Sequence, residues 1–169
     1  MSEVGYTHFW DRVETIPEEK FDQIVSDFSK IIPRLKEKGI RLSGAFGWGS
    51  PVVNNNEIIF NGFGTNSCEA FYFPRVMESS ILFPKLSNDK IFVFCKTHRL
   101  PYDLAVTSLL LILGHHLGKE SIDIESNGDY NDWKDAIKLC QNELGYSVSD
   151  ALTLHDDEGN NILVVDKVP

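Results

Sequence analysis

The sequence contains little cysteine, no long hydrophobic run and no excess of basic residues. Its three cysteines, Cys68, Cys95 and Cys140, are an odd number without a C-x-x-C spacing, which argues against a disulfide framework and favours a reducing compartment. The longest apolar run, around Leu109–Leu113, is far shorter than the roughly 20 residues that a membrane helix needs. The first ten residues lack the basic segment of a secretory signal. We therefore predict a cytoplasmic protein that has no membrane partner.

The acidic character is concentrated in the last third of the chain. Residues 120–169 contain 12 acidic and three basic residues, whereas residues 1–119 contain 13 of each, so the net charge of −9 arises after residue 119. Binding to nucleic acid through its phosphates requires the opposite sign, which argues against nucleic acid as a partner. The acidic third can face a basic protein partner, or it can simply be a solvated surface.

Length and hydrophobic pattern predict one globular α+β domain over residues 1–169. With 169 residues and 42% hydrophobic content, the chain can build a core without a metal or disulfide. The 3.6-residue period predicts three helices. The first follows a capping box at Thr15–Glu18 and is ended or kinked by Pro33. The second runs from Pro101 to about His116 and is apolar on nearly every side, which is typical of a buried central helix. The third is capped by Asp129.

Between the helices, short apolar or alternating segments predict strands. They are 40–46, 57–60, 68–73, 91–95, 121–125 and 161–165. Residues 1–14 are expected to form an irregular lead-in. The segment 91–125 has the order of a right-handed β-α-β unit. The prediction is an α+β single domain with a mixed, mostly antiparallel sheet of about five or six strands and three helices, mainly on one face.

Polar residues gather where the strand 91–95 ends and the second helix begins. Lys96, Thr97 and Arg99 combine two positive charges and a hydroxyl with a nearby helix N-terminus, a place that attracts anions. If the strand 121–125 is parallel to 91–95, the loop Ser126–Asp129 lies beside them, and ligands favour such an edge. The predicted ligand-binding residues are Lys96, Thr97, Arg99, Asn61, Glu69, Tyr102, Asp103, Asn127 and Asp132. A structural alternative is that Arg99 pairs with Asp103 while Lys96 neutralises the acidic loop.

Other chemistries have weaker support, and we predict neither a metal nor a cofactor. The segment Asp123–Gly128 resembles the start of a calcium loop, but Lys134 stands where the closing glutamate belongs. His115 and His116 are adjacent on a helix and point about 100° apart, and no zinc spacing is present. Cys68 could act as a nucleophile with His98 or His8 as base, but nothing in the sequence brings these groups together.

Several segments resemble a family of small proteins of unknown function found in bacteria, phages and some other genomes. The segments are Tyr6–His8, Ile59–Gly62, Cys68–Phe71, Phe94–Asp103 and Ser126–Gly128, together with Trp133. The most specific is Phe94–Asp103, which fits the motif F-C-K-T-x-R-x-P-Y-D. The family pattern has Ser-Asp-Gly where this chain has Ser126-Asn127-Gly128. The resemblance implies a phage-related protein with no established activity, and its polar motif residues fall in the same strand-end loops.

We therefore expect an uncharacterised domain that binds a polar or anionic ligand at the loops Lys96–Arg99 and Ser126–Asp129. A first alternative is a hydrolase or transferase that uses Glu69, Asp103 or Cys68 at the same place. A second is a protein-interaction module that acts through the acidic C-terminal third. The sequence leaves open whether the protein is an enzyme and what its oligomeric state is.

Overall fold

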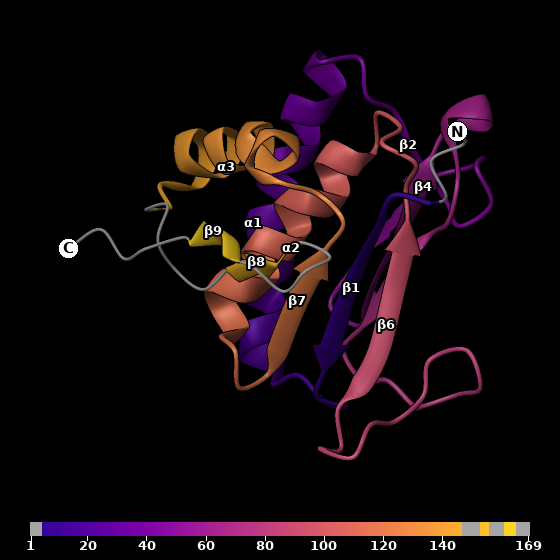
Figure 1. Cartoon of the computed structure of the whole chain (residues 1–169). Coiled ribbons are helices and arrows are strands. Elements are labelled where there is room, and N and C mark those ends of the chain that lie inside the picture. Colours follow the sequence, from indigo (N-terminus) through magenta and orange to yellow (C-terminus); the bar gives the residue numbers. More distant parts are fainter. Residues whose placement is uncertain (1–4, 147–152, 156–160, 165–169) are drawn as a thin grey trace.

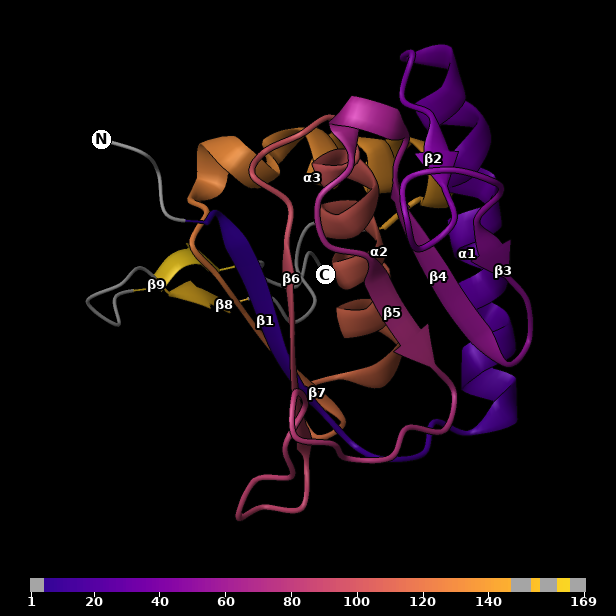
Figure 2. The same cartoon turned by 90° about the vertical axis from the view of Figure 1, so that its right-hand side faces the viewer.

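The described residues form an α+β fold with three α-helices and three small antiparallel sheets (Figures 1 and 2). The computed structural model describes residues 5–146, 153–155 and 161–164. The helices are α1 (Glu18–Glu37), α2 (Asp103–Leu117) and α3 (Tyr130–Leu144), with a short 3-10 turn η1 (Gly64–Asn66). The strands are β1 (Thr7–Arg12), β2 (Leu42–Ser43), β3 (Val52–Val53), β4 (Glu57–Gly62), β5 (Phe71–Pro74), β6 (Ile91–Lys96), β7 (Ile122–Ser126), β8 (Thr153–His155) and β9 (Asn161–Val164). The predicted fold class is confirmed.

The sheet that positions the candidate site has the order β6-β1-β7. Both outer strands are antiparallel to β1, so β6 and β7 run parallel to each other with β1 between them. This parallel relation is what the predicted β-α-β unit over 91–125 requires. Thr7 faces Lys96 and His8 faces Ser126 in the register. The beginning of β1 therefore meets the carboxyl ends of β6 and β7. The order β1–α1–β2 gives a further β-α-β succession.

The second sheet is built around β4. Ile59 pairs with Val52 of β3 and with Tyr72 of β5, so these two strands lie on opposite edges of β4, and β2 pairs with the end of β4. A single core joins both sheets to the helices. Trp10 of β1, for example, stacks on Phe71 of β5 with ring centroids 5.0 Å apart.

Helix α2 is the buried central helix that the sequence predicts. Its residues from Ala105 to Gly114 are all buried, and it packs against both α1 and α3, as Figure 1 shows. The third helix also follows the prediction, because Asp129 and Asp132 form a capping box and Gly145 ends the helix with φ 69°. Among the described residues, no helix is long and apolar enough to cross a membrane.

Three local predictions are wrong or incomplete. The segment expected to be an irregular lead-in contains β1, the central strand of its sheet. The alternation of apolar and polar residues in β1 is hard to recognise because its inward positions include His8 and Arg12, which are buried polar residues. No capping box starts α1, whose N-cap is Pro17 without a side-chain hydrogen bond, while Thr15 forms a β-bridge with Val76. Helix α1 also continues through Pro33 to Glu37.

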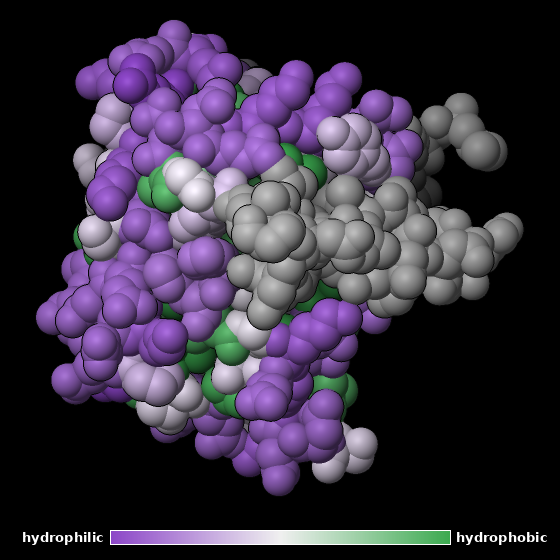
Figure 3. Space-filling model, turned by 90° about the vertical axis from the view of Figure 1, so that its left-hand side faces the viewer, coloured by the Kyte–Doolittle hydropathy of each residue, from purple (hydrophilic) through white to green (hydrophobic). Residues whose placement is uncertain are grey.

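The predicted strands 40–46 and 68–73 are shorter in the structure, at β2 and β5 respectively. The predicted strand 161–165 appears as β9, which pairs with the unpredicted β8. The face of the molecule that carries α3 is mainly hydrophilic outside the grey segments (Figure 3). This surface fits the amphipathic pattern of α3, whose buried stripe contains Trp133 and Cys140.

Candidate functional site at the strand ends

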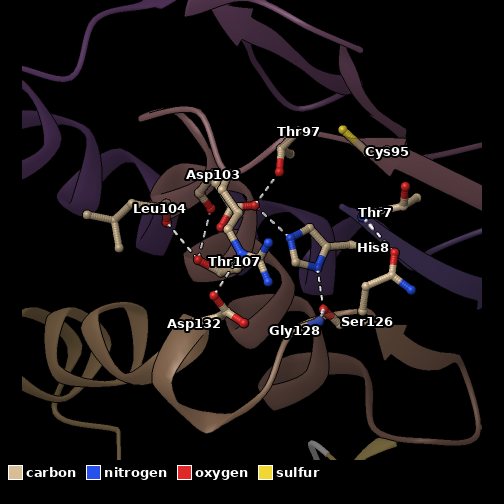
Figure 4. Close-up of polar contacts among 12 residues, drawn as sticks. Thr7, His8, Cys95, Thr97, Asp103, Leu104, Thr107, Ser126, Gly128 and Asp132 are labelled. Carbon is tan, nitrogen blue, oxygen red and sulfur yellow. Dashed lines mark hydrogen bonds and ion pairs between the residues drawn. The ribbon is translucent and has the colours of Figure 1, made fainter. Parts of the chain in front are cut away.

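A chain of polar side chains connects β1, β6, β7 and α2 at the strand ends (Figure 4). His8 Nδ1 lies 2.8 Å from Ser126 Oγ, and His8 Nε2 lies 2.7 Å from Asp103 Oδ1. The same Asp103 oxygen accepts a hydrogen bond of 2.6 Å from the Thr97 hydroxyl. His8 and Thr97 are fully buried, and the Asp103 side chain is 14% exposed. The four side chains therefore form one buried network.

The hydrogen-bond donors around Ser126 fix the direction of the network. Ser126 Oγ accepts N–H bonds from Gly128 at 2.9 Å and from the Trp133 indole at 3.3 Å. Because both lone pairs are then in use, the Ser126 hydroxyl donates its proton to His8 Nδ1. We therefore assign the His8 proton to Nε2, from which it is donated to Asp103. The rings of Tyr6 and Trp133 contact the imidazole edge-on, at centroid distances of 5.0 and 5.3 Å.

Arg99 lies at the surface above this network. Its Nε donates to Asp132 at 3.1 Å, its guanidinium carbon lies 4.2 Å from the centre of the Tyr6 ring, and its side chain is 42% exposed. Partial burial alone would raise the pKa of Asp132. The hydrogen bonds from Arg99 and the Asp129 N–H, together with the charge of Arg99, outweigh burial, so the pKa of Asp132 is lowered. His98 and Arg99 have φ of 53° and 56°, a left-handed conformation that costs free energy and is concentrated at functional loops.

The structure brings some of the predicted residues together in pairs. Arg99 pairs with Asp132, and Thr97 with Asp103. The Glu69 carboxylate accepts the Lys96 backbone N–H at 2.8 Å. The alternative was that Arg99 pairs with Asp103; in the structure Arg99 Nε donates to Asp132, and Asp103 Oδ1 is shared by His8 and Thr97.

Three predicted residues use their polar groups to hold the backbone. The buried Asn61 amide bonds to Ala45 and Cys68 backbone atoms. The hydroxyl of Tyr102 donates to the Glu69 carbonyl at 2.6 Å. The exposed Asn127 accepts the Thr7 backbone N–H at 2.9 Å. These residues shape the loops, and Asn61 and Tyr102 are too buried to meet a ligand.

The thiol hypothesis gains no support from the geometry. Cys68 is half-buried, and burial raises the pKa of its thiol. His8, one proposed base, has both ring nitrogens engaged by Ser126 and Asp103. In the described part of the chain, no group of three or more histidine, cysteine or carboxylate side chains is placed to hold a metal ion.

The predicted ligand-binding residues include neither His8 nor Ser126, although Ser126 begins the predicted loop Ser126–Asp129 and His8 was considered as a base for Cys68. The signal available for His8 was its inward position between Tyr6 and Trp10 in an alternating segment, and for Ser126 its inward position after Ile122 and Ile124. Two surface hollows of about 570 and 550 Å³ lie elsewhere, one beside Asp27 and His116 and the other beside Lys36 and Arg41.

No known protein family, curated protein or solved structure matches the chain.

Proposed function

We propose that the protein binds a small anionic ligand at the strand-end loops Lys96–Arg99 and Ser126–Asp129. The observation that carries the proposal is the placement of Arg99. Its guanidinium is held by Asp132 and by the Tyr6 ring, yet 42% of the side chain is exposed. A guanidinium that is already oriented loses less conformational entropy when it binds a carboxylate or phosphate group.

The surrounding loops support this use of Arg99. The Lys96 side chain lies against Gly5, the residue before Tyr6, so both cations contact the same short segment. The ends of the parallel strands β6 and β7 and the start of α2 meet here, and ligands of α/β units commonly bind at such an edge. The buried network of His8, Ser126 and Asp103 joins β1, β7 and α2 beneath the loops.

Titration of the protein with inorganic phosphate and with acetate, followed by amide NMR, tests the proposal. We expect shifts concentrated in residues 96–99 and 126–129, and their loss in Arg99→Ala and in Lys96→Ala/Arg99→Ala. Arg34→Ala is the matched control, because Arg34 has similar exposure and also pairs with carboxylates, Glu37 and Glu143. Equal binding by wild type and the double variant would refute the proposal.

A second candidate function, a hydrolase, is favoured by one specific observation. The order serine, histidine, aspartate is that of an activated serine nucleophile, here with the two ring nitrogens exchanged. Ser126 Oγ would attack the carbonyl carbon of an ester while His8 Nδ1 accepts its proton, and Asp103 would stabilise the imidazolium. His8 would then give that proton to the departing alcohol as the ester C–O bond breaks, and water would release the acyl group from Ser126 by the same route. Of the residues that the sequence proposed for an enzyme, Asp103 and His8 belong to this network, whereas Glu69 and Cys68 do not.

Burial argues against this second candidate, since Ser126 is 5% exposed and its oxygen has three polar neighbours. A fluorophosphonate probe with mass analysis of the native protein decides the question. Fast labelling of Ser126 in the native protein that is absent from Ser126→Ala would support a hydrolase, and an unlabelled native protein would exclude it.

An interaction module acting through the acidic C-terminal third stays a prediction, because residues 147–152, 156–160 and 165–169 lie outside the described residues. The cytoplasmic location rests on the sequence pattern, and the phage association rests on the family resemblance.

A further inference from the structure

A second place on the molecule has the properties of a binding surface. A groove of about 550 Å³ lies between the C-terminal half of α1 and the edge of the second sheet. Figure 2 shows these elements side by side, with α1 next to β2 and β3. The groove is lined by Ile32, Lys36, Gly39, Ile40, Arg41, Leu42 and Pro51. Its lining is thus mainly apolar and contains two cations and no carboxylate.

The two cations differ from Lys30 and Arg34, which lie earlier on α1. Lys30 and Arg34 form ion pairs with carboxylates, whereas Lys36 and Arg41 make no ion pair with any carboxylate of the residues that the structure describes. Arg41 is nevertheless held in place, because its guanidinium carbon lies 3.6 Å from the centre of the Phe63 ring. On a chain with a net charge of −9, this groove is locally positive.

The loop between β2 and β3 carries two exposed aromatic side chains. It begins and ends beside the lining residues Leu42 and Pro51, and it is folded back by a hydrogen bond from the Gly44 N–H to the Trp48 carbonyl. Phe46 and Trp48 on this loop are 85% and 72% exposed. Aromatic side chains and arginine are enriched in protein interfaces, where they supply much of the binding free energy.

We propose that this surface binds a short acidic peptide segment of a partner protein, with a large apolar side chain in the groove. Charge complementarity argues for the acidic residues, which would meet Lys36 and Arg41. The aliphatic lining and the exposed aromatic residues argue for the apolar side chain. A concave groove with Arg41 fixed on Phe63 suits a discrete carboxylate on a peptide better than the flat surface of a bilayer.

Trp48 provides the assay, because the other two tryptophans, Trp10 and Trp133, are buried. The probe is an eight-residue peptide with leucine flanked by aspartates. We expect it to shift Trp48 emission to shorter wavelength and to shift amide resonances of residues 32–51. The same peptide with lysine in place of aspartate, or with alanine in place of leucine, should bind at least tenfold more weakly.

Two variants separate the contributions. Lys36→Glu/Arg41→Glu should weaken binding of the acidic peptide at least tenfold while leaving the unfolding midpoint nearly unchanged, since both side chains are exposed. Lys30→Glu/Lys20→Glu is the matched control, and it should bind like wild type. The proposal is overturned if the amides of 32–51 do not move at millimolar peptide. It is also overturned if the double variant binds normally, or if only phosphatidylserine vesicles or single-stranded DNA bind this face.

Discussion

Replacing Ser126 with alanine removes one oxygen atom that three buried groups share. The Gly128 N–H at 2.9 Å and the Trp133 indole at 3.3 Å donate to it, and His8 Nδ1 at 2.8 Å receives its proton. Since Ser126 is 5% exposed, water does not readily replace the oxygen. The substitution therefore leaves a backbone donor, an indole donor and an imidazole acceptor without partners.

The contacts allow the size of the effect to be worked out. Leaving a buried polar group unsatisfied costs about 1–3 kcal/mol. The two short contacts contribute about 1–1.5 kcal/mol each, and the longer indole contact adds about 0.5 kcal/mol. We expect a loss of about 3 kcal/mol in the free energy of unfolding. With a urea m-value of about 2 kcal/mol/M, the unfolding midpoint falls by about 1.5 M.

Equilibrium urea unfolding followed by tryptophan fluorescence at pH 7 measures this loss. Ser108→Ala is the matched control, because Ser108 is also buried but its hydroxyl has no hydrogen-bond partner among the described residues. Removing an unsatisfied hydroxyl from the middle of α2 should leave stability unchanged or raise it by about 0.5 kcal/mol. A loss below about 1 kcal/mol for Ser126→Ala, or an equal loss for both variants, would refute the reasoning.

Three further predictions concern packing, charge and thiols. Gly62→Ala should lose about 3 kcal/mol of stability or fail to fold, because a Cβ there would lie 1.9 Å from the Asn66 carbonyl oxygen; thermal unfolding checks this. Burial and the opposite Asp123 raise the pKa of Asp11 in the folded protein. Protonated Asp11 therefore favours the folded state below pH 4, and this stabilisation is lost as the pH rises through the raised folded pKa. Asp11→Asn should therefore stabilise the protein by about 0.5 kcal/mol at pH 7 but not at pH 3 in urea unfolding. A thiol reagent should label only Cys68 in the native protein, slowly, and all three cysteines after unfolding.

The helices and the buried strands could be predicted because their patterns follow burial directly. Helix α2 is apolar on nearly every side and is buried from Ala105 to Gly114, and Asp129 and Gly145 mark the ends of α3 by local hydrogen bonding and backbone conformation. Strand β1 was missed for the opposite reason. The inward positions of β1 include a histidine and an arginine, and Arg12 is fully buried because its guanidinium donates to the carbonyl oxygens of Pro74 and Arg75. Such partners are distant in sequence, so no local pattern reveals them.

The candidate site was predicted in place but not in its pairings. The parallel relation of β6 and β7 was enough to bring Arg99 near the loop that follows β7, which is where it meets Asp132. The pairing of Asp103 with His8 depends on β1 lying between those strands. Without that strand, nothing in the sequence placed His8 beside Asp103. Missing β1 in the fold therefore also meant missing this contact in the site.

The same contacts that stabilise Ser126 also limit what it can do. To attack a substrate, its oxygen must leave the Gly128 and Trp133 donors, and Tyr6 and Trp133 must move from the imidazole that they cover. If that opening costs about 3 kcal/mol, reaction of Ser126 is slowed by about 150-fold relative to a serine that is exposed and aligned. Labelling by a fluorophosphonate would then accelerate in urea below the unfolding transition, because urea favours the open state. A rate that is fast and independent of urea would instead mean that Ser126 is reached without opening, and that the network is a catalytic device rather than a structural one.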